Sequence, residues 1–189
     1  MTKNIMIVGV GGQGTLLASK ILGKLFLEKG YDVKVSEVHG MSQRGGSVVT
    51  YVRYGEKVYS PIIDKAEADF IVSFEQLEAA RWSEYLANDG TIVTNTQKIN
   101  PMPVITGKMG YPNEVLLKLE GLGHKVDSFD ALSLANEAGS SKCVNLVLLG
   151  RLSNYFDFSI EDWNEAIKSQ VPEKFLEMNL KAFELGKNA

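Results

Sequence analysis

The sequence predicts an α/β fold: a Rossmann-like, mostly parallel sheet flanked by helices, with an antiparallel hairpin insertion near residues 47–63 and C-terminal helices. Three observations predict it. Short apolar runs typical of buried strands alternate with segments whose apolar residues recur at helical spacing. The first apolar run leads directly into a glycine-rich turn and a helix, which is the order of a βαβ unit. From about residue 140 onward the patterns are helical without strands.

The first βαβ unit is expected over residues 4–38. Asn4–Val8 is a short apolar run and predicts a buried strand, which the Gly9–Gly14 turn follows at once. Apolar side chains then recur at helical spacing, and Gly30 stands where a glycine commonly ends a helix. Residues 31–38 alternate as a strand does. We therefore expect a right-handed crossover between two parallel strands.

The antiparallel hairpin is expected next. Residues 47–54 alternate, Gly55-Glu56 interrupts them, and residues 57–63 resume an extended pattern. Pro61 places the second arm at a sheet edge or ends it early. The gap between Glu37 and Ser47 is too short for a crossover helix, which takes about a dozen residues or more, so the parallel repeat cannot simply continue.

The later α/β elements follow in simple order. Residues 88–90 predict a turn, and the proline- and glycine-interrupted residues 99–110 predict a loop with at most a short extended piece. The expected strands are residues 68–73, 90–94 and 125–129, and the expected helices are residues 75–87, 113–121 and 131–138.

The C-terminal part carries helix-start signals. Gly139–Lys142 precedes a nearly all-apolar helix in which Asn145 is embedded. A buried Asn must find partners, so its side chain makes either a packing hydrogen bond or a site contact. Ser159, with Asp162 three residues on, predicts a capping-box start for a helix to about Ser169. A last helix is expected to begin at Pro172 and to be stopped by Gly186.

Composition excludes several classes of protein. The 189 residues are 44% hydrophobic and carry a net charge of -3 without a basic stripe, which argues against nucleic acid or an anionic membrane as the main partner. No signal peptide is visible, and no segment approaches the roughly 20 apolar residues of a membrane span. One cysteine excludes a disulfide framework and favours the cytoplasm.

Metal and cluster sites are not expected either. A lone Cys143 cannot hold an iron–sulfur cluster, which needs several thiolates, and its apolar helical context predicts a buried, inert thiol. The only histidines are His39 and His124, so we expect no zinc site.

Two glycine-rich stretches carry the chemistry. In the first, Gly9, Gly11 and Gly14 match G-x-G-x-x-G after a strand and before a helix, which predicts backbone N–H groups aimed at a phosphate, or tight strand–helix packing alone. Glu37 is a candidate for the acidic residue that contacts a ribose in dinucleotide-binding folds. A polar loop follows it instead of a second crossover helix, which weakens that interpretation.

The second stretch, His39–Gly46, places imidazole, hydroxyl, amide and guanidinium groups between glycines. Taken alone, it is either a turn or a binding loop. Because parallel strands end at one sheet edge, we expect the two stretches to lie side by side, with Glu75, Asn95 and Asp130 at neighbouring strand ends. No Ser-His-Asp triad, carboxylate pair or thiamine-diphosphate motif is present; residues 88–90 lack the first glycine of Gly-Asp-Gly. Any redox chemistry therefore belongs to cofactors of another chain.

Gly9–Gly14 together with His39–Gly46 resembles the gamma-type subunit of the 2-oxoacid:ferredoxin oxidoreductase family. Asp130 and the helix with Lys142, Asn145 and Gly150 extend the resemblance over essentially the whole chain. It implies a single gamma-type domain over residues 1–189, with its C-terminal helical part at about 140–189. Within the family the chain is most similar to the small (beta) subunit of indolepyruvate ferredoxin oxidoreductase, with pyruvate and 2-oxoglutarate gamma subunits as alternatives.

The resemblance implies an accessory subunit, inactive alone, of a complex that oxidatively decarboxylates 2-oxo acids to acyl-CoA with ferredoxin as electron acceptor. Thiamine diphosphate, magnesium and [4Fe-4S] clusters are expected on a large partner subunit, and this chain is expected to help form the coenzyme A cleft. Arg44 would contact a substrate carboxylate or a coenzyme A phosphate, with Ser42 and Gln43 as hydrogen-bond partners. A free-standing nucleotide-binding Rossmann-like enzyme is the alternative.

No catalytic residue and no metal ligand is assigned. The residues expected to line the cofactor site are Gly9, Gly11, Gly12, Gln13, Gly14, His39, Gly40, Met41, Ser42, Gln43, Arg44, Gly45 and Gly46.

Overall fold

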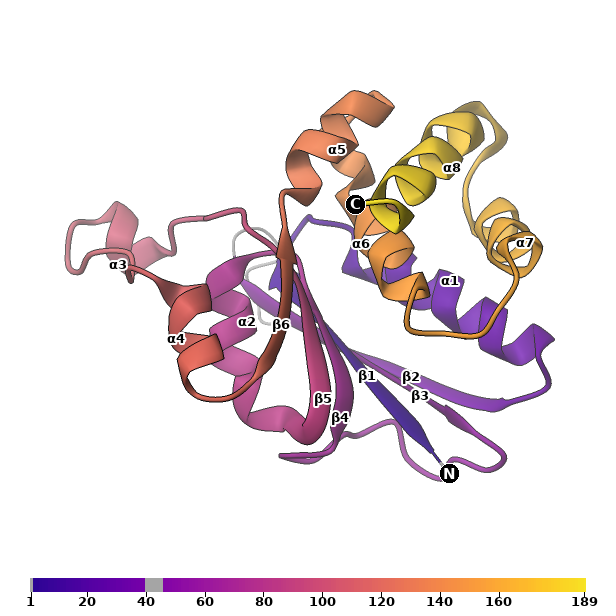
Figure 1. Cartoon of the computed structure of the whole chain (residues 1–189), viewed down its shortest axis with the longest axis horizontal. Coiled ribbons are helices and arrows are strands. Elements are labelled where there is room, and N and C mark those ends of the chain that lie inside the picture. Colours follow the sequence, from indigo (N-terminus) through magenta and orange to yellow (C-terminus); the bar gives the residue numbers. More distant parts are fainter. Residues whose placement is uncertain (1, 40–45) are drawn as a thin grey trace.

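The computed structural model of the chain describes residues 2–39 and 46–189, with the backbone alone described at His39. Within these residues a six-stranded sheet has helices on both faces (Figure 1). The strands are β1 (Lys3–Val10), β2 (Asp32–His39), β3 (Ser47–Gly55), β4 (Ala68–Ser73), β5 (Leu86–Asn95) and β6 (Lys125–Phe129). Their order across the sheet is β2-β3-β1-β4-β5-β6, and β1, β4, β5 and β6 pair in parallel.

The helices form two layers around this sheet, as the sequence predicts. α2 and α4 cover one face, while α1 and the C-terminal helices cover the other (Figure 1). The α-helices are α1 (Thr15–Glu28), α2 (Gln76–Trp82), α3 (Met102–Ile105), α4 (Val115–Gly121), α5 (Ala131–Ala138), α6 (Val144–Ser153), α7 (Ile160–Gln170) and α8 (Glu173–Lys187). Two short 3₁₀ turns, η1 (Ser83–Tyr85) and η2 (Ser141–Cys143), adjoin α2 and α6.

The strand β1 separates two hydrophobic layers. Ile5 and Ile7 face the layer that includes α1 and α6, whereas Met6 and Val8 face the layer that includes α2 and α4. All four side chains are fully buried. The predicted burial of Cys143 is confirmed: it is 2% exposed, and burial raises the pKa of its thiol. Among the described helices, none is both long and apolar enough to cross a membrane.

The antiparallel part of the sheet differs from the predicted hairpin. β3 is present, but residues 57–63 do not form the second arm; β3 pairs instead with β2 on one side and with β1 on the other, antiparallel to both. The predicted parallel strands β1 and β2 therefore run in the same direction but are separated by β3.

Side chains satisfy the backbone of residues 57–63 in place of a strand ladder. The carboxylate of Asp32 accepts the N–H of Val58 at 2.9 Å. The guanidinium of Arg53 donates to the carbonyls of Ser60 and Ile62. The Asp32 contact joins residues distant in sequence, and the Arg53 contacts come from a side chain on β3, so local alternation of apolar side chains could not reveal them. Pro61, which lacks an N–H, is also poorly suited to a ladder.

Two other boundaries differ from prediction. β5 begins at Leu86, so the predicted turn at residues 88–90 lies inside the strand, where the register with β4 is irregular. Gly90 allows β5 to approach β4 closely there, because a Cβ at this position would lie 2.7 Å from the carbonyl oxygen of Ala68. The predicted loop 99–110 contains the short helix α3, whose N-cap is Pro101.

The crossing of α6 and α8 depends on two glycines. A Cβ on Gly150 would lie 2.0 Å from the carbonyl oxygen of Phe183, and one on Gly186 would lie 1.9 Å from that of Val147. Gly186 was predicted to stop the last helix, but α8 continues to Lys187. Because Gly186 has no side chain, the backbones of α6 and α8 pack in direct contact.

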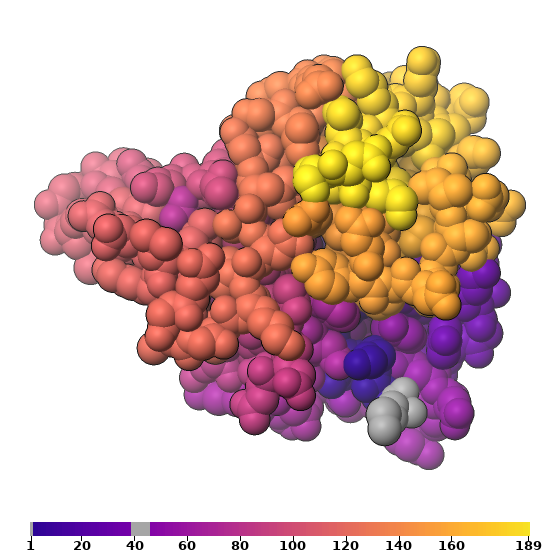
Figure 2. Space-filling model, viewed as in Figure 1, coloured from indigo at the N-terminus to yellow at the C-terminus, as the bar shows by residue number. Residues whose placement is uncertain are grey.

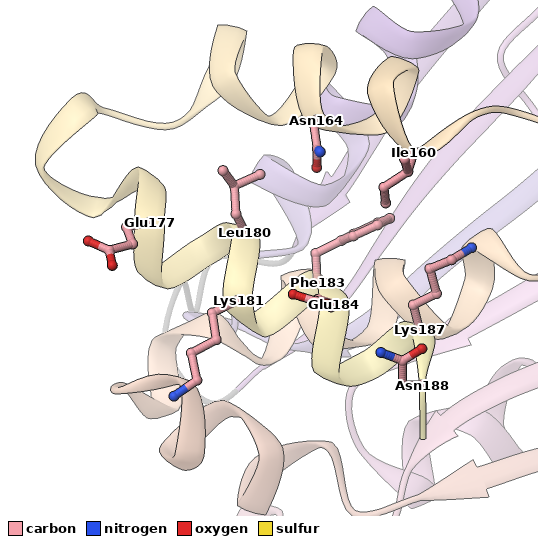
Figure 3. Close-up of a pocket in the computed structure, with 9 residues that line it drawn as sticks. All are labelled: Ile160, Asn164, Glu177, Leu180, Lys181, Phe183, Glu184, Lys187 and Asn188. Carbon is pink, nitrogen blue, oxygen red and sulfur yellow. The ribbon is translucent and has the colours of Figure 1, made fainter.

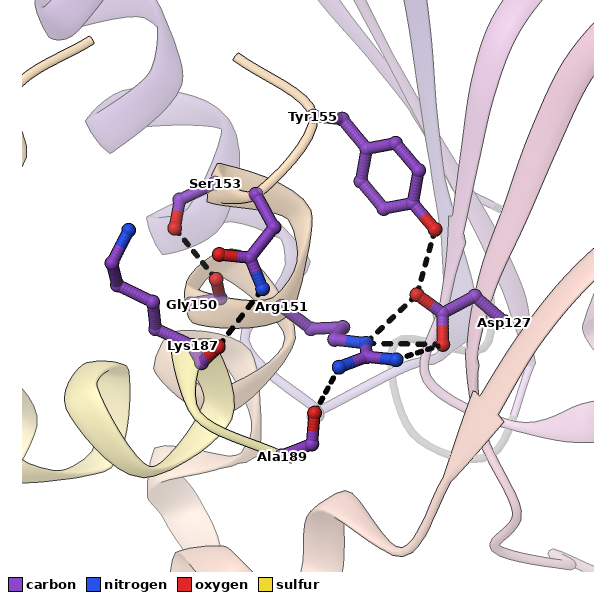
Figure 4. A network of polar contacts seen from close by, with 8 residues as sticks. Asp127, Gly150, Arg151, Ser153, Tyr155, Lys187 and Ala189 are labelled. Carbon is purple, nitrogen blue, oxygen red and sulfur yellow. Dashed lines mark hydrogen bonds and ion pairs between the residues drawn. The ribbon is translucent and has the colours of Figure 1, made fainter. Parts of the chain in front are cut away.

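A polar network ties the C-terminal helices to the edge of the sheet (Figure 4). Arg151 donates to both carboxylate oxygens of Asp127 on β6, at 2.8–3.0 Å, and to the backbone carbonyl of Ala189. The hydroxyl of Tyr155 donates to the same carboxylate at 2.8 Å. This bidentate pair fixes the orientation of α6 relative to β6.

We predict that Gly150→Ala destabilises the protein by about 3 kcal/mol, because the added methyl group forces α6 and α8 apart. Gly121→Ala is the matched control: Gly121 is also helical, and nothing lies within 4 Å of its added Cβ. The control should be neutral or stabilising by up to about 1 kcal/mol, the helix propensity of Ala over Gly. Urea unfolding of both variants measures the difference, and equal stability would contradict the close crossing.

Candidate functional site

The glycine loop at the carboxyl end of β1 is held in shape by its own side chains. The amide oxygen of Gln13 accepts the N–H of Val10 at 2.7 Å, and its amide nitrogen donates to the carbonyl of Phe74 at 3.3 Å. A Cβ on Gly9 would lie 2.9 Å from that amide oxygen. Gly9 and Gln13, both predicted to contact a cofactor, therefore shape the loop from inside.

The two glycine-rich stretches meet, as the sequence predicts. The N–H of Gly11 donates to the carbonyl of Gly46 at 2.8 Å. This bond uses the Gly11 donor that was expected to face a ligand. Gly12 and Gly14 have φ values of 100° and 90°, and their N–H groups find no acceptor among the described residues. They and the first turn of α1 thus leave open donors at the positive end of a helix dipole.

Most of the second predicted stretch cannot be compared with the structure. Gly40, Met41, Ser42, Gln43, Arg44 and Gly45 lie outside the described residues, and of His39 only the backbone is described. Their predicted contacts with a cofactor or substrate stay predictions. The carbonyl of Gly46 accepts the N–H of Gly11, and this hydrogen bond connects the second stretch to the glycine loop.

Two hollows flank the glycine loop and share Gly12 and Gly14. One, of about 380 Å³, is lined on its far side by Glu37 and Val48. The hydroxyl of Thr50 donates to the Glu37 carboxylate at 3.3 Å. Glu37 therefore lies beside the loop, where a ribose-binding acid is expected in a dinucleotide site, although β3 rather than a crossover helix follows it.

The second hollow, of about 450 Å³, lies between the glycine loop and the start of α6. Gln97, Lys142 and Asn145 contribute its polar groups. The Lys142 side chain is exposed and makes no ion pair within the described part of the chain. The Lys142 ammonium, two amides and the N–H groups of a helix start suit an anion such as phosphate.

Asn145 makes a packing hydrogen bond and also lines this hollow. It is 3% exposed; its amide nitrogen donates to the carbonyl of Gly14 at 3.4 Å, and its amide oxygen accepts the N–H of Leu146 at 3.0 Å. A Cβ on Gly14 would lie 3.0 Å from the Asn145 amide nitrogen. The packing hydrogen bond is therefore confirmed for Asn145, and a contact to a ligand in this hollow stays a prediction.

The sequence did not reveal that two carboxylates at the start of α2 are buried, and neither of them lines the two hollows. Glu75, 1% exposed, caps α2 through the N–H of Glu78 at 2.9 Å. Glu78, 4% exposed, accepts the hydroxyl of Ser47 and lies 3.4 Å from Arg81. Burial raises the pKa of Glu78. The sequence marked Glu75 as a strand end, and the capping position was the signal that could have revealed its burial.

The other strand-end residues have structural roles. The amide oxygen of Asn95 accepts the N–H of Ala131 at 3.2 Å, which joins β5 to α5. Asp130 caps α5 by accepting both the N–H and the hydroxyl of Ser133, and these hydrogen bonds lower the pKa of Asp130. Neither side chain is among those that line the two hollows.

A larger groove, of about 670 Å³, lies along α7 and α8 (Figure 3). Its walls mix apolar side chains such as Leu180 with charged groups of both signs, including Lys181 and Glu184. Lys181 donates to the carbonyl of Glu137 at 2.9 Å. The groove contains none of the strand-end residues, so the candidate site stays at the glycine loop. In the described part of the chain, no group of three or more His, Cys, Asp or Glu residues is placed to hold a metal.

Comparison with known proteins gives the family of this chain. The family model for pyruvate ferredoxin/flavodoxin oxidoreductase matches residues 4–189. The chain belongs to this family. It is 47% identical to the indolepyruvate oxidoreductase subunit IorB of Thermococcus kodakarensis, covering 98% of this chain and 95% of the relative. It is 45% identical to IorB of Pyrococcus horikoshii with the same coverage. The predicted resemblance is confirmed.

Solved structures show the same fold. The gamma subunit of a keto/oxoacid ferredoxin oxidoreductase from Geobacter sulfurreducens matches with a TM-score of 0.72 at 24% identity, covering 98% of this chain and 96% of that one. A 2-oxoglutarate:ferredoxin oxidoreductase from Magnetococcus marinus, solved with 2-oxoglutarate, coenzyme A and succinyl-CoA, matches with a TM-score of 0.74 at 20% identity. The match covers 99% of this chain but 30% of that one, so the fold also occurs as part of a longer chain.

We predict that Glu78→Gln stabilises the protein at pH 7, by on the order of 1 kcal/mol. Because the folded-state pKa of Glu78 is raised, its contribution to stability is complete below the unfolded pKa and is lost as pH rises through the folded pKa. The variant and the native chain should therefore converge near pH 4 and diverge towards neutral pH. Unfolding free energies across that range test this.

Glu120→Gln on α4 is the matched control, since Glu120 is exposed and its carboxylate makes no hydrogen bond or ion pair among the described residues. Its stability difference from the native chain should not change with pH. A Glu78→Gln difference that is equally flat would show that the buried carboxylate carries no penalty.

Proposed function

We propose that this chain is the small subunit of an indolepyruvate ferredoxin oxidoreductase. The observation that carries the proposal is its 47% identity to IorB over nearly the full length of both chains. Identity falls to 28% for the common gamma subunit of pyruvate and ketoisovalerate oxidoreductases from Pyrococcus abyssi. This difference favours indolepyruvate over pyruvate as the substrate of the complex.

The proposed complex converts a 2-oxo acid and coenzyme A to an acyl-CoA and carbon dioxide, and passes the two electrons released to ferredoxin. A larger partner subunit holds thiamine diphosphate, magnesium and [4Fe-4S] clusters, which supply the carbanion and electron-transfer chemistry. The small subunit contributes the glycine-rich edge of its sheet. This edge forms one wall of the cleft that admits coenzyme A. It also binds the thiamine-bearing partner.

The residues at this edge fit an anionic group of coenzyme A. The open N–H groups of Gly12 and Gly14, the positive end of α1 and the ammonium of Lys142 converge on one hollow. Such donors bind phosphate without base-specific contacts. Arg44, from the neighbouring loop outside the described residues, is the proposed second cation, which meets a phosphate or the substrate carboxylate.

Reconstitution tests the proposal. The small chain, the large subunit and their mixture are each assayed for coenzyme A-dependent ferredoxin reduction with indolepyruvate, pyruvate or 2-oxoglutarate. Only the mixture should turn over, and fastest with indolepyruvate. Turnover by the small chain alone would overturn the subunit role. Tight binding of NAD(P)H to the isolated chain in calorimetry would favour the alternative, a free-standing nucleotide-binding enzyme.

We predict that Lys142→Met raises the KM for coenzyme A about tenfold while leaving the KM for the 2-oxo acid unchanged, since one charge-assisted contact is lost. Lys168→Met, on an exposed site of α7, is the matched control and should change neither constant. Arg44→Ala extends the test. If Lys142→Met and Arg44→Ala both leave the complex assembled and kinetically normal, the anion-binding role is wrong.

A further inference from the structure

Residues 99–111 form an arm that projects from the carboxyl end of β5 (Figures 1 and 2). The arm is shaped by its own backbone. The N–H of Ile105 donates to the carbonyl of Pro101 at 3.0 Å, and the N–H groups of Lys108 and Met109 both donate to the carbonyl of Pro103, at 2.9 and 3.2 Å. These bonds fold the arm around α3 without help from the body of the molecule.

Both ends of the arm are attached to a single buried carboxylate. Glu75 accepts the N–H of Ile99 at 3.1 Å where the arm leaves the sheet, and it accepts the hydroxyl of Tyr111 where the arm returns. Burial and this contact raise the pKa of Tyr111, which keeps the hydroxyl protonated. The ammonium of Lys98 lies 5.7 Å from the centre of the Tyr111 ring. A buried carboxylate is costly unless it is fully hydrogen-bonded, so Glu75 gives the arm a fixed base.

The arm exposes three large apolar side chains. Met102, Ile105 and Met109 are 65%, 64% and 60% exposed. Single exposed apolar residues are ordinary, but three long ones on one projecting arm are typical of a protein–protein contact. Methionine adapts its shape to irregular grooves. From residue 98 to residue 113 the charged residues are Lys98 and Lys108, with no Asp or Glu.

The arm lies beside the edge with the glycine loop. Ile99, at the base of the arm, lines the same hollow as Gly12 and Lys142. The N–H of Gln76 donates to the carbonyl of Gln97 at 3.2 Å, which ties the base of the arm to α2. The arm is therefore continuous with the edge proposed to face the large subunit, and this inference rests on the proposed function.

We infer that the arm is a docking element that inserts Met102, Ile105 and Met109 into an apolar groove on the large thiamine-bearing subunit, with acidic side chains at the rim of that groove. The apolar side chains supply the affinity, and Lys108 on the arm with Lys98 just before it, in a segment without carboxylates, select the acidic rim. The arm thereby fixes the position of the glycine-rich edge relative to the large subunit.

Affinity measurements on full-length chains test the inference. The triple variant Met102→Ser, Ile105→Ser, Met109→Ser should bind the large subunit at least about tenfold more weakly, with unchanged unfolding because these side chains are exposed. The matched control replaces Leu117 and Leu122 with Ser; they are also exposed, at 63% and 74%, but belong to α4 and the turn after it. The control should bind within about twofold of the native chain.

Charge reversal tests the acidic rim separately. Lys108→Glu should weaken binding several-fold at low salt and less at high salt, whereas Lys118→Glu on α4 should not. Hydrogen exchange should show residues 99–111 protected in the complex. Native affinity of the triple variant, or unchanged exchange in the arm, would overturn the inference.

Two outcomes separate the inference from the proposed function. If the native chain fails to bind the large subunit, the proposed function fails and the inference falls with it. If the native complex turns over and the triple variant binds equally well, the docking arm alone is wrong. Light scattering on the isolated chain completes the test, since a dimer that the triple variant abolishes would assign the arm to a second copy of this chain and overturn the inference.

Discussion

The antiparallel insertion of β3 between β1 and β2 is the constraint on which the candidate site depends. It pairs Val10 with Ser47 and His39 with Val48, so the end of β1, the end of β2 and the start of β3 share one edge. The hydrogen bond from Gly11 to Gly46 then joins the two glycine-rich stretches directly. Had β2 paired with β1 in a simple parallel repeat, the second stretch would have led into a crossover helix instead of folding back beside the first.

A second constraint acts at the end of β4. The Glu75 carboxylate caps α2. It also accepts a backbone N–H where the arm begins and the hydroxyl of Tyr111 where the arm ends. One carboxylate therefore joins the sheet, a helix and a projecting segment. The surrounding edge offers N–H donors, amides and Lys142, which are groups suited to binding and orienting a ligand. Such an edge becomes useful when another chain supplies the reacting groups, which supports the proposed role as an accessory subunit.

Local signals in the sequence predicted much of this fold. β6 and α5 have the predicted bounds, and the capping box of Ser159 and Asp162 is present, because each of these depends on residues close in the chain. The edge where the glycine stretches meet was also predicted, from strand direction alone. Residues 57–63 were wrongly predicted as a strand because the side chains of Arg53 and of Asp32, which is distant in sequence, bind that backbone. The burial of Glu78 had no local signal, since Ser47 covers it from β3.

The C-terminal helices connect packing far from the site to its shape. Lys142 and Asn145 lie at or just before the start of α6. The position of α6 therefore sets the width of the hollow beside the glycine loop. Gly150 and Gly186 let α8 press against α6, and Arg151 attaches the same helix to Asp127 on β6. Gly150 and Arg151 act on the second half of α6, Gly186 packs on Val147 in its first half, and Asn145 contacts the carbonyl of Gly14 near its start. Because contacts at both ends fix the position of α6, residues that touch no ligand nonetheless determine the distance between the Lys142 ammonium and the glycine-loop donors.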